Sequence, residues 1–178
     1  MASLGIYHWN KDNKSGLEAS IASFRKYHPN APYFVACDAA GGSQYDICKK
    51  YNVISKEHNG DYIPVEIIKE KFDLGLDCIN IAPEFGLIET QTYLDEIKNS
   101  KLLDRFWQIC YDSKKWVKWV NPGFDPYYNK EQLVKISGHY VLSYPEFISD
   151  IKSQFPGIDE KVKANVTKKL NQLYGYEA

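Results

Sequence analysis

The sequence lacks cysteines at the spacings of metal-binding or redox motifs. No C-x-x-C pair and no zinc-finger pattern occurs among its four cysteines, Cys37, Cys48, Cys78 and Cys110. The chain also lacks a signal peptide and any apolar run long enough to cross a bilayer. We therefore expect reduced thiols in a cytoplasmic protein with no membrane partner.

An excess of charge of either sign is also missing. Lysine and arginine number 22 against 23 aspartates and glutamates, which gives a formal net charge of −1. This balance excludes a module that binds nucleic acid by broad phosphate neutralisation. A hydrophobic content of 44% excludes a disordered tail. Because 178 residues suffice to bury a core, we expect a single compact domain over residues 1–178.

Aromatic residues, in contrast, are abundant. They make up 15% of the chain, and tyrosine alone occurs 14 times. Tyrosine side chains supply flat, half-polar surface of the kind that sugar and nucleotide sites use. The alternative is a core and surface that are simply rich in tyrosine.

The first third of the chain alternates short apolar runs with segments of helical periodicity. The segment 4–9 predicts a strand, and Ser15 with Glu18 forms a capping box for a helix. Residues 33–37 and 52–58 predict further strands, separated by a helix that Ser43 is placed to cap. This alternation favours βαβ units and a parallel sheet, whose strand C-termini lie along one edge.

The later part of the chain is predominantly helical. After a helix from Pro64 to about Gly75 and a strand over 77–82, apolar periodicity predicts helices over 87–97, 102–111, 132–142 and 145–155, with a last amphipathic helix carrying Val162 to Leu173. The predicted fold class is α/β, a short parallel sheet followed by a mostly helical C-terminal part. The sheet is incomplete relative to a full barrel or a full nucleotide-sugar transferase fold.

The stretch from residue 20 to residue 53, SIASFRKYHPNAPYFVACDAAGGSQYDICKKYNV, resembles the opening of GT-A nucleotide-sugar glycosyltransferases. The resemblance covers about residues 4–54. It implies that Asp38, with Ser43 beside it, contacts the nucleoside of a sugar donor. The D-x-D metal motif of that family occurs nowhere in the chain. The alternative is that Asp38 is an ordinary helix-entry or turn residue.

Three other stretches resemble class II sugar-phosphate aldolase barrels of the tagatose-bisphosphate type. They are KEHNGDYIP at 56–64, INIAPEFGLIET at 79–90 and LVKISGHYVLSYPEF at 133–147, within about 54–178. The resemblance implies an aldolase-like part that binds a phosphorylated sugar or related polyol. Since a complete barrel takes about 250 residues, we expect a chimeric α/β unit that is closed by homo-oligomerisation, or a fragment.

The strand ends independently indicate a candidate site. Polar residues fall at or near the C-terminal ends of successive predicted strands, where parallel α/β folds place their active sites. We assign candidate catalytic roles as base, proton carrier or orienting group to His58, Asp61 and Glu84. Candidate substrate-binding residues are Glu57, Asn59 and Asn80.

Each assignment has a structural alternative. Glu84 suits the N-terminus of the next helix through the helix dipole, and Asp61 suits a turn. For His58, a functional role as metal ligand or proton carrier and a purely structural role both remain open. Aldolase chemistry would require a divalent metal, zinc or magnesium, to stabilise the enediolate intermediate. Catalytic zinc usually has three protein ligands, and the candidate site contains only one histidine.

A different hypothesis makes the chain a non-catalytic subunit or structural partner. Its aromatic helices around Phe106, Trp107, Trp116 and Trp119 would then form an interface. We expect Trp116 and Trp119 to pack in the core on one helix face, with a stacking platform as the alternative. The segment 121–128, with two prolines and a glycine, is either a lid or a connector.

Overall fold

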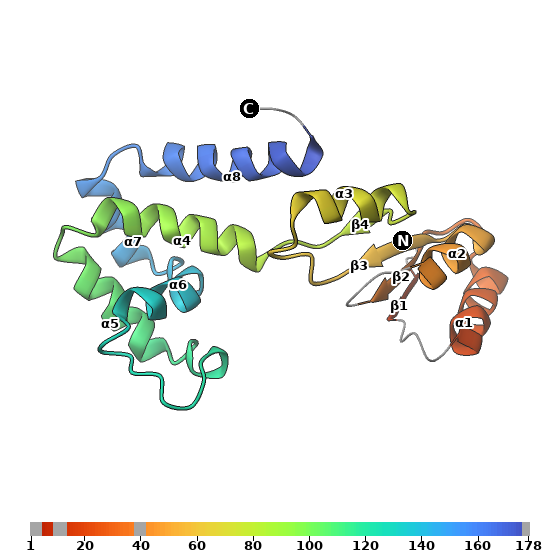
Figure 1. Ribbon diagram of the computed structural model, residues 1–178, viewed down its shortest axis with the longest axis horizontal. Coiled ribbons are helices and arrows are strands. Elements are labelled where there is room, and N and C mark those ends of the chain that lie inside the picture. Colours follow the sequence, from red (N-terminus) through yellow and green to blue (C-terminus); the bar gives the residue numbers. More distant parts are fainter. Residues whose placement is uncertain (1–4, 9–13, 38–41, 176–178) are drawn as a thin grey trace. The chain divides into compact units, whose positions relative to one another are not determined.

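The computed structural model describes residues 5–8, 14–37 and 42–175, with side chains from residue 16 onward except at 42 and 43. The chain divides into two compact units, Met1–Ile81 and Ala82–Ala178. Figure 1 labels the elements of both. The α/β class predicted from the sequence is confirmed. The division after Ile81 differs from the single domain expected, and also from the change of resemblance near residue 54.

The first unit is a parallel sheet connected by helices. Its strands are β1 (Gly5–His8), β2 (Tyr33–Cys37), β3 (Ile54–Glu57) and β4 (Cys78–Ile79), in the spatial order β1-β2-β3-β4. The connecting helices are α1 (Lys14–Tyr27), α2 (Gly42–Tyr51) and α3 (Val65–Asp73). Each strand therefore pairs with its predecessor in the chain, in parallel.

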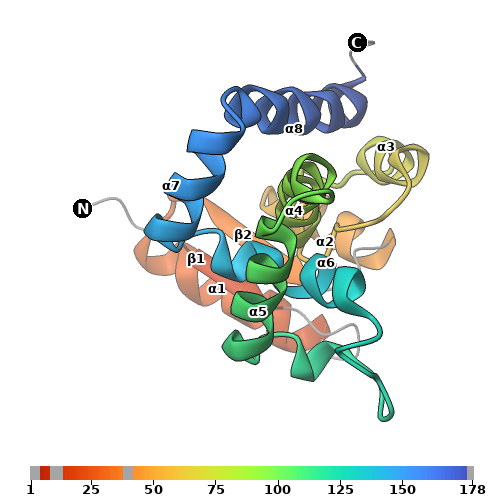
Figure 2. The same ribbon diagram turned by 90° about the vertical axis from the view of Figure 1, so that its left-hand side faces the viewer.

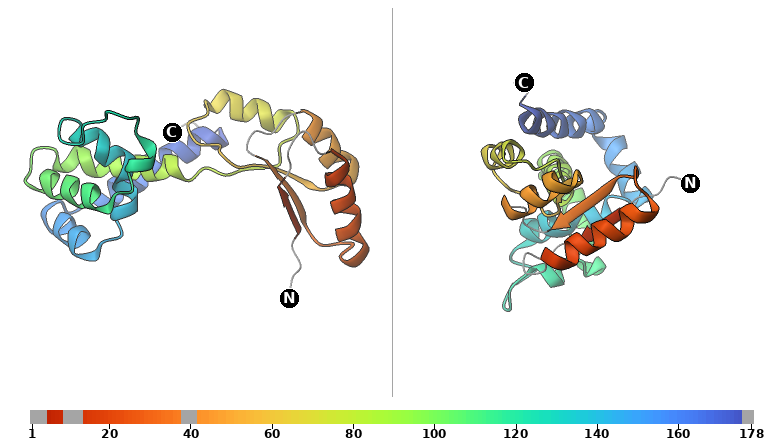
Figure 3. Two further views of the ribbon diagram at one scale, coloured as in Figure 1. Left: turned by 90° about the horizontal axis from the view of Figure 1, so that it is seen from below. Right: turned by 90° about the vertical axis from the view of Figure 1, so that its right-hand side faces the viewer.

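One face of this sheet carries the core of the first unit. Leu17 of α1 and Ile47 of α2 both belong to the buried cluster that contains Tyr33 and Val35. Because side chains two apart on a strand point to the same face, α1 and α2 cover the same side of β2. Figure 3 shows α1, α2 and α3 along one side of the strands, as right-handed crossovers in a constant direction require.

The second unit is helical. Its elements are α4 (Pro83–Ile97), α5 (Leu102–Ser113), the short 3₁₀ helix η1 (Val117–Trp119), α6 (Lys130–Val141), α7 (Pro145–Gln154) and α8 (Ile158–Tyr174). Helix α4 packs against both α6 and α8 and lies between them in Figure 2. The core includes Phe106 and Phe147, whose ring centroids are 5.0 Å apart.

Small residues let α4 and α6 approach closely. A Cβ built at Gly138 of α6 would lie 2.4 Å from Cγ2 of Thr90 on α4. One built at Gly86 of α4 would lie 2.8 Å from Cβ of His139. Neither position has room for a methyl group, so the two glycines set the distance between the helices.

The element boundaries follow the sequence patterns with local differences. Helix α2 begins at Gly42, so Ser43 lies inside the first turn and not at the predicted cap position. Strand β4 has only two residues, although the apolar pattern predicted six over 77–82. The expected helix from 87 begins at Pro83, because proline fits the first helical position.

The prediction that Trp116 and Trp119 both pack in the core on one helix face is wrong for Trp119. Lys114 ends α5 in the left-handed conformation, with φ of 56°. The chain therefore leaves the helix before either tryptophan. Trp116 is partly buried beside the core, whereas Trp119 in η1 is 58% exposed.

Candidate functional site

The candidate site in the first unit is built by the chain segments that follow β3 and β4. Glu57 and Ile79 are register partners at the ends of these strands, so His58 and Asn80 follow side by side. Asn80 Nδ2 lies 3.4 Å from His58 Nδ1. In the tautomer that carries its ring proton on Nε2, His58 Nδ1 can accept this long hydrogen bond from the amide nitrogen. The structure thus brings together two of the residues predicted from the sequence.

Backbone hydrogen bonds hold this edge in place. His58 N donates to Cys37 O at 2.8 Å, and Asn80 N donates to Glu57 O at 2.9 Å. Gly60 N donates to Asn80 O at 3.0 Å, which ties the loop after β3 to the loop after β4. The backbone positions of His58 and Asn80 are therefore fixed by main-chain hydrogen bonds.

Gly60 is required by this close approach. A Cβ at this position would lie 2.4 Å from Cγ1 of Ile79 and 2.9 Å from the carbonyl oxygen of Asn80. Gly60 lies in the segment 56–64, but the sequence pattern assigned it no role. A glycine between two polar residues after a strand was the available signal.

Glu57 lies on the helical side of the sheet edge. Its Oε2 is 2.7 Å from Nζ of Lys71 on α3, and the two side chains are 2% and 19% exposed. Tyr45 of α2 is near this carboxylate. Burial first, and then the charge of Glu57, raises the pKa of Tyr45 to about 12. The geometry gives Glu57 an ion pair inside the unit, while its predicted role in substrate binding stays a prediction.

Asn59 and Asp61 lie in the loop between β3 and α3. Asn59 is exposed, Asp61 is half-buried, and Asp61 and Tyr62 form a turn. Tyr62 has a φ of 62°, in the left-handed region that residues other than glycine rarely adopt. The backbone of Asp61 therefore has the turn conformation that its structural alternative predicted. The loop that carries Asp61 also contains a strained residue, Tyr62.

Glu84 belongs to the second unit. It lies in the first turn of α4, where its carboxylate is favoured by the helix dipole. Its Oε1 is 2.6 Å from Nζ of Lys169 on α8, and the two side chains are 13% and 15% exposed. Glu84 therefore lies at the N-terminus of a helix, as its structural alternative predicted.

The residues of the nucleotide alternative are only partly described. Asp38 lies outside the described residues. Ser43 lies in the first turn of α2, and its side chain is outside the description. Their predicted contacts with a donor nucleoside stay predictions.

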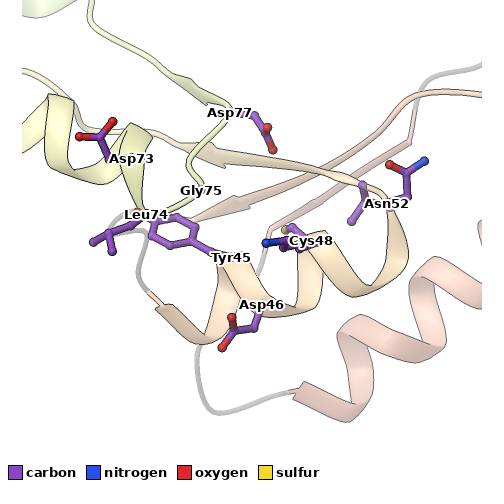
Figure 4. A pocket seen from close by; sticks show the side chains of 10 residues that line it. Tyr45, Asp46, Cys48, Asn52, Asp73, Leu74, Gly75 and Asp77 are labelled. Carbon is purple, nitrogen blue, oxygen red and sulfur yellow. The ribbon is translucent and has the colours of Figure 1, made fainter.

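A pocket of about 400 Å³ lies at the opposite edge of the first unit (Figure 4). Helix α2, the C-terminal end of α3 and the residues that lead into β3 and β4 line it, including Tyr45, Asp46, Asn52, Asp73 and Asp77. The sequence pattern did not reveal this pocket, because its lining comes from two stretches that are distant in sequence, 45–53 and 73–77.

One carboxylate of the pocket has a structural partner. Asp77 Oδ2 accepts a hydrogen bond of 2.8 Å from Ser55 N, and Asp77 N donates to Ser55 Oγ at 2.9 Å. These bonds join the start of β4 to β3. Active sites of parallel α/β proteins lie at the C-terminal strand ends, so the edge with His58 remains the candidate functional site.

Within the described residues, no three histidine, cysteine, aspartate or glutamate side chains gather as a metal-binding group. No helix in that part of the chain is both long and apolar enough to cross a membrane. Comparison of the chain with protein-family models, curated proteins and solved structures finds no match.

Proposed function

We propose that the first unit binds a phosphorylated sugar or a related polyol at the sheet edge formed by His58, Asn59 and Asn80. The observation that carries the proposal is the juxtaposition of His58 Nδ1 and Asn80 Nδ2, 3.4 Å apart at the C-terminal ends of adjacent parallel strands. Any aldolase-like chemistry is a further step beyond binding.

The strand order supports this function over nucleotide-sugar binding. In a doubly wound nucleotide-binding sheet, the chain returns past β1 after β3, and the ligand binds at that switch point. Here β4 pairs with β3, so each new strand is added at the same side of the sheet and the order does not reverse. Sequential parallel strands with their helices on one side are the arrangement found in α/β barrels.

The side chains at this edge suit hydroxyl and phosphate groups. In the tautomer whose Nδ1 accepts from Asn80, the Nε2–H of His58 is a donor for a hydroxyl or phosphate oxygen. The amides of Asn59 and Asn80 supply both donors and acceptors. Few, fixed polar groups of this kind are typical of small-molecule sites.

The test is a thermal-shift titration of the purified chain with two ligand sets, sugar phosphates and nucleotide sugars, each with and without zinc or magnesium. A ligand at 100 times its Kd stabilises the folded state by about 2.7 kcal/mol, so binding is detected without knowledge of a reaction. We expect stabilisation by a sugar phosphate that is lost in His58→Ala and in Asn80→Ala.

His28→Ala is the matched control, because His28 is exposed in the same unit and follows α1, at the other edge of the sheet. This variant should keep the full shift. Stabilisation by nucleotide sugars alone, lost in Asp38→Ala, would refute the proposal in favour of the transferase-related hypothesis. The predicted homo-oligomer stays a prediction.

A second candidate function, that of a non-catalytic partner of another protein, is favoured by a specific observation in the second unit. Four exposed apolar or aromatic side chains occur within residues 117–128, with exposed fractions between 52% and 87%. Phe106 and Trp107 of the predicted interface are buried, whereas Trp119 is exposed.

A further inference from the structure

The stretch of chain between α5 and α6, which can be followed in Figure 1, carries exposed aromatic rings and lysines. We call it the aromatic–basic corner. Its apolar members have exposed fractions of 52% for Val117, 58% for Trp119, 62% for Tyr127 and 87% for Tyr128. Its basic members are Lys114, Lys115 and Lys118, which are all exposed.

A layer of stacked rings supports the corner from beneath. Tyr111 of α5 stacks on Trp107 at 5.3 Å and on Trp116 at 5.9 Å between ring centroids. Tyr127 packs on both Tyr111 and Trp107, at 5.5 and 5.3 Å, and Trp116 packs on Phe124 at 5.9 Å. These contacts join α5, Trp116 before η1, and the 121–129 loop into one packed structure.

Hydrogen bonds fix the loop that carries the two tyrosines. The Asp125 carboxylate accepts from Tyr127 N at 2.8 Å and from Tyr128 N at 3.0 Å. Trp107 Nε1 donates to Pro126 O at 3.0 Å, so the loop is also attached to the core of the unit. The exposed Tyr127 ring is held against Trp107 and Tyr111 before any partner arrives, which lowers the entropy cost of binding.

The charge of the corner is unbalanced. Lys114, Lys115 and Lys118 form no ion pair with a carboxylate among the described residues, whereas Lys130, Lys135, Lys152, Lys161 and Lys169 of the same unit each do. Two of the corner ammonium groups lie over aromatic rings instead, Lys114 over Tyr111 at 3.9 Å and Lys118 over Trp119 at 4.6 Å. Two carboxylates lie in the same region, Asp112 of α5 and Asp125 of the loop, and both already accept hydrogen bonds from neighbouring groups. Three ammonium groups against these two carboxylates leave an excess of positive charge for the carboxylates of a partner.

We propose that the aromatic–basic corner binds a segment of another protein that carries carboxylates beside apolar or aromatic side chains. Fixed aromatic anchors within a charged rim are the composition of protein-interaction hot spots. The unpaired lysines specify an acidic partner by charge complementarity. Three lysines on a chain of net charge −1 are few for nucleic-acid binding, and the corner is a braced turn and not the amphipathic helix typical of membrane surfaces.

The experiment is a fluorescence-anisotropy titration of the full chain against a labelled random copolymer of glutamate and tyrosine. A random copolymer presents many local arrangements of acid and ring, so the partner sequence need not be known. Polyglutamate tests charge alone, and a lysine–tyrosine copolymer tests rings with the opposite charge. We expect the glutamate–tyrosine copolymer to bind most tightly, and more weakly as salt screens the lysines.

Variants assign the binding to the corner. Trp119→Ala and Lys118→Glu should each weaken binding of the copolymer by about tenfold or more, as expected for an anchor and its flanking charge. Tyr174→Ala and Lys163→Glu are matched controls, because both residues are exposed on α8. The controls should bind as the unchanged chain does.

Three results would overturn the proposal. One is no binding of the glutamate–tyrosine copolymer at low salt. Another is binding that Trp119→Ala and Lys118→Glu leave unchanged, or that the α8 controls reduce equally. The third is binding only to vesicles of equal parts phosphatidylcholine and phosphatidylserine, which would identify an anionic lipid surface as the partner.

Discussion

Replacement of Gly138 by alanine tests the packing of the second unit most sharply. The new Cβ would lie 2.4 Å from Thr90 Cγ2, 3.0 Å from Thr90 Oγ1 and 3.0 Å from Phe106 Cζ. Thr90 has little freedom to move, because its Oγ1 donates to Gly86 O at 2.8 Å. Phe106 is fully buried in the core.

Two effects of opposite sign compete at this position. Alanine in place of glycine inside a helix is favourable by about 1 kcal/mol. Overpacking of a filled core costs about 1–3 kcal/mol, and occasionally more. Since the 2.4 Å contact is far inside van der Waals distance, we expect the steric cost to win, with a net loss of about 1–2 kcal/mol.

Urea unfolding followed by circular dichroism measures this loss. The companion variant Thr90→Ser keeps the hydroxyl and removes the methyl that is closest to the new Cβ. Combined with Gly138→Ala, it should restore part of the lost stability, and a double-mutant cycle gives the coupling. A neutral or stabilised Gly138→Ala protein, or a cycle without coupling, would refute the assignment of this contact.

Three further predictions concern buried titratable groups. No described residue offers the buried Tyr45 hydroxyl a hydrogen bond, so Tyr45→Phe should leave the free energy of unfolding unchanged or raise it by up to about 1 kcal/mol. Because the folded pKa is raised from 10.0 to about 12, only the unfolded state ionises in that window, and stability should fall as pH rises through it. Urea titrations should show a smaller fall for Tyr45→Phe, and equal pH dependence would contradict this. Burial raises the pKa of the Cys48 and Cys110 thiols to about 12, so Ellman's reagent should label them slowly until the chain unfolds, and rapid labelling at neutral pH would be inconsistent with their burial. Burial lowers the pKa of His139 below 6.5, so the unfolded state takes up a proton first as pH falls. Stability should therefore decrease below about pH 6.5, and His139→Gln should flatten this dependence in urea unfolding, an effect that an unchanged slope would rule out.

Local patterns predicted much of the secondary structure. The helix expected over 145–155 is observed as Pro145–Gln154, because Pro145 suits a helix start and Phe147 and Ile151 recur on one buried face. The strand expected over 33–37 is observed with those bounds, since its apolar run is bounded by Pro32. Such elements are determined by residues close in sequence.

Tertiary context determined the rest. The sequence pattern did not reveal that Lys114 turns left-handed at the end of α5, which moved Trp119 from the expected core to the surface. The division after Ile81 depends on β4 pairing with β3, a contact between distant segments.

The part of the candidate site that lies at the ends of the strands could be predicted from the sequence. His58 and Asn80 were expected at one sheet edge, and the register of β3 with β4 places them together. Glu84 was grouped with them on its position after a strand, but the unit boundary places it with α4, where Lys169 pairs with it. The pairing of Glu57 with Lys71 was not predicted, because a side chain seven residues into α3 supplies the cation.

The most direct test of the proposed binding function is a ¹H–¹⁵N correlation spectrum recorded during titration with sugar phosphates. The side-chain amide of Asn80 and the imidazole of His58 report on the site themselves. We predict saturable shift changes at these groups and in residues 57–62, with the helices of the second unit unaffected. Absence of these changes for every sugar phosphate, or changes confined to residues 38–44 with nucleotide sugars, would contradict the proposal.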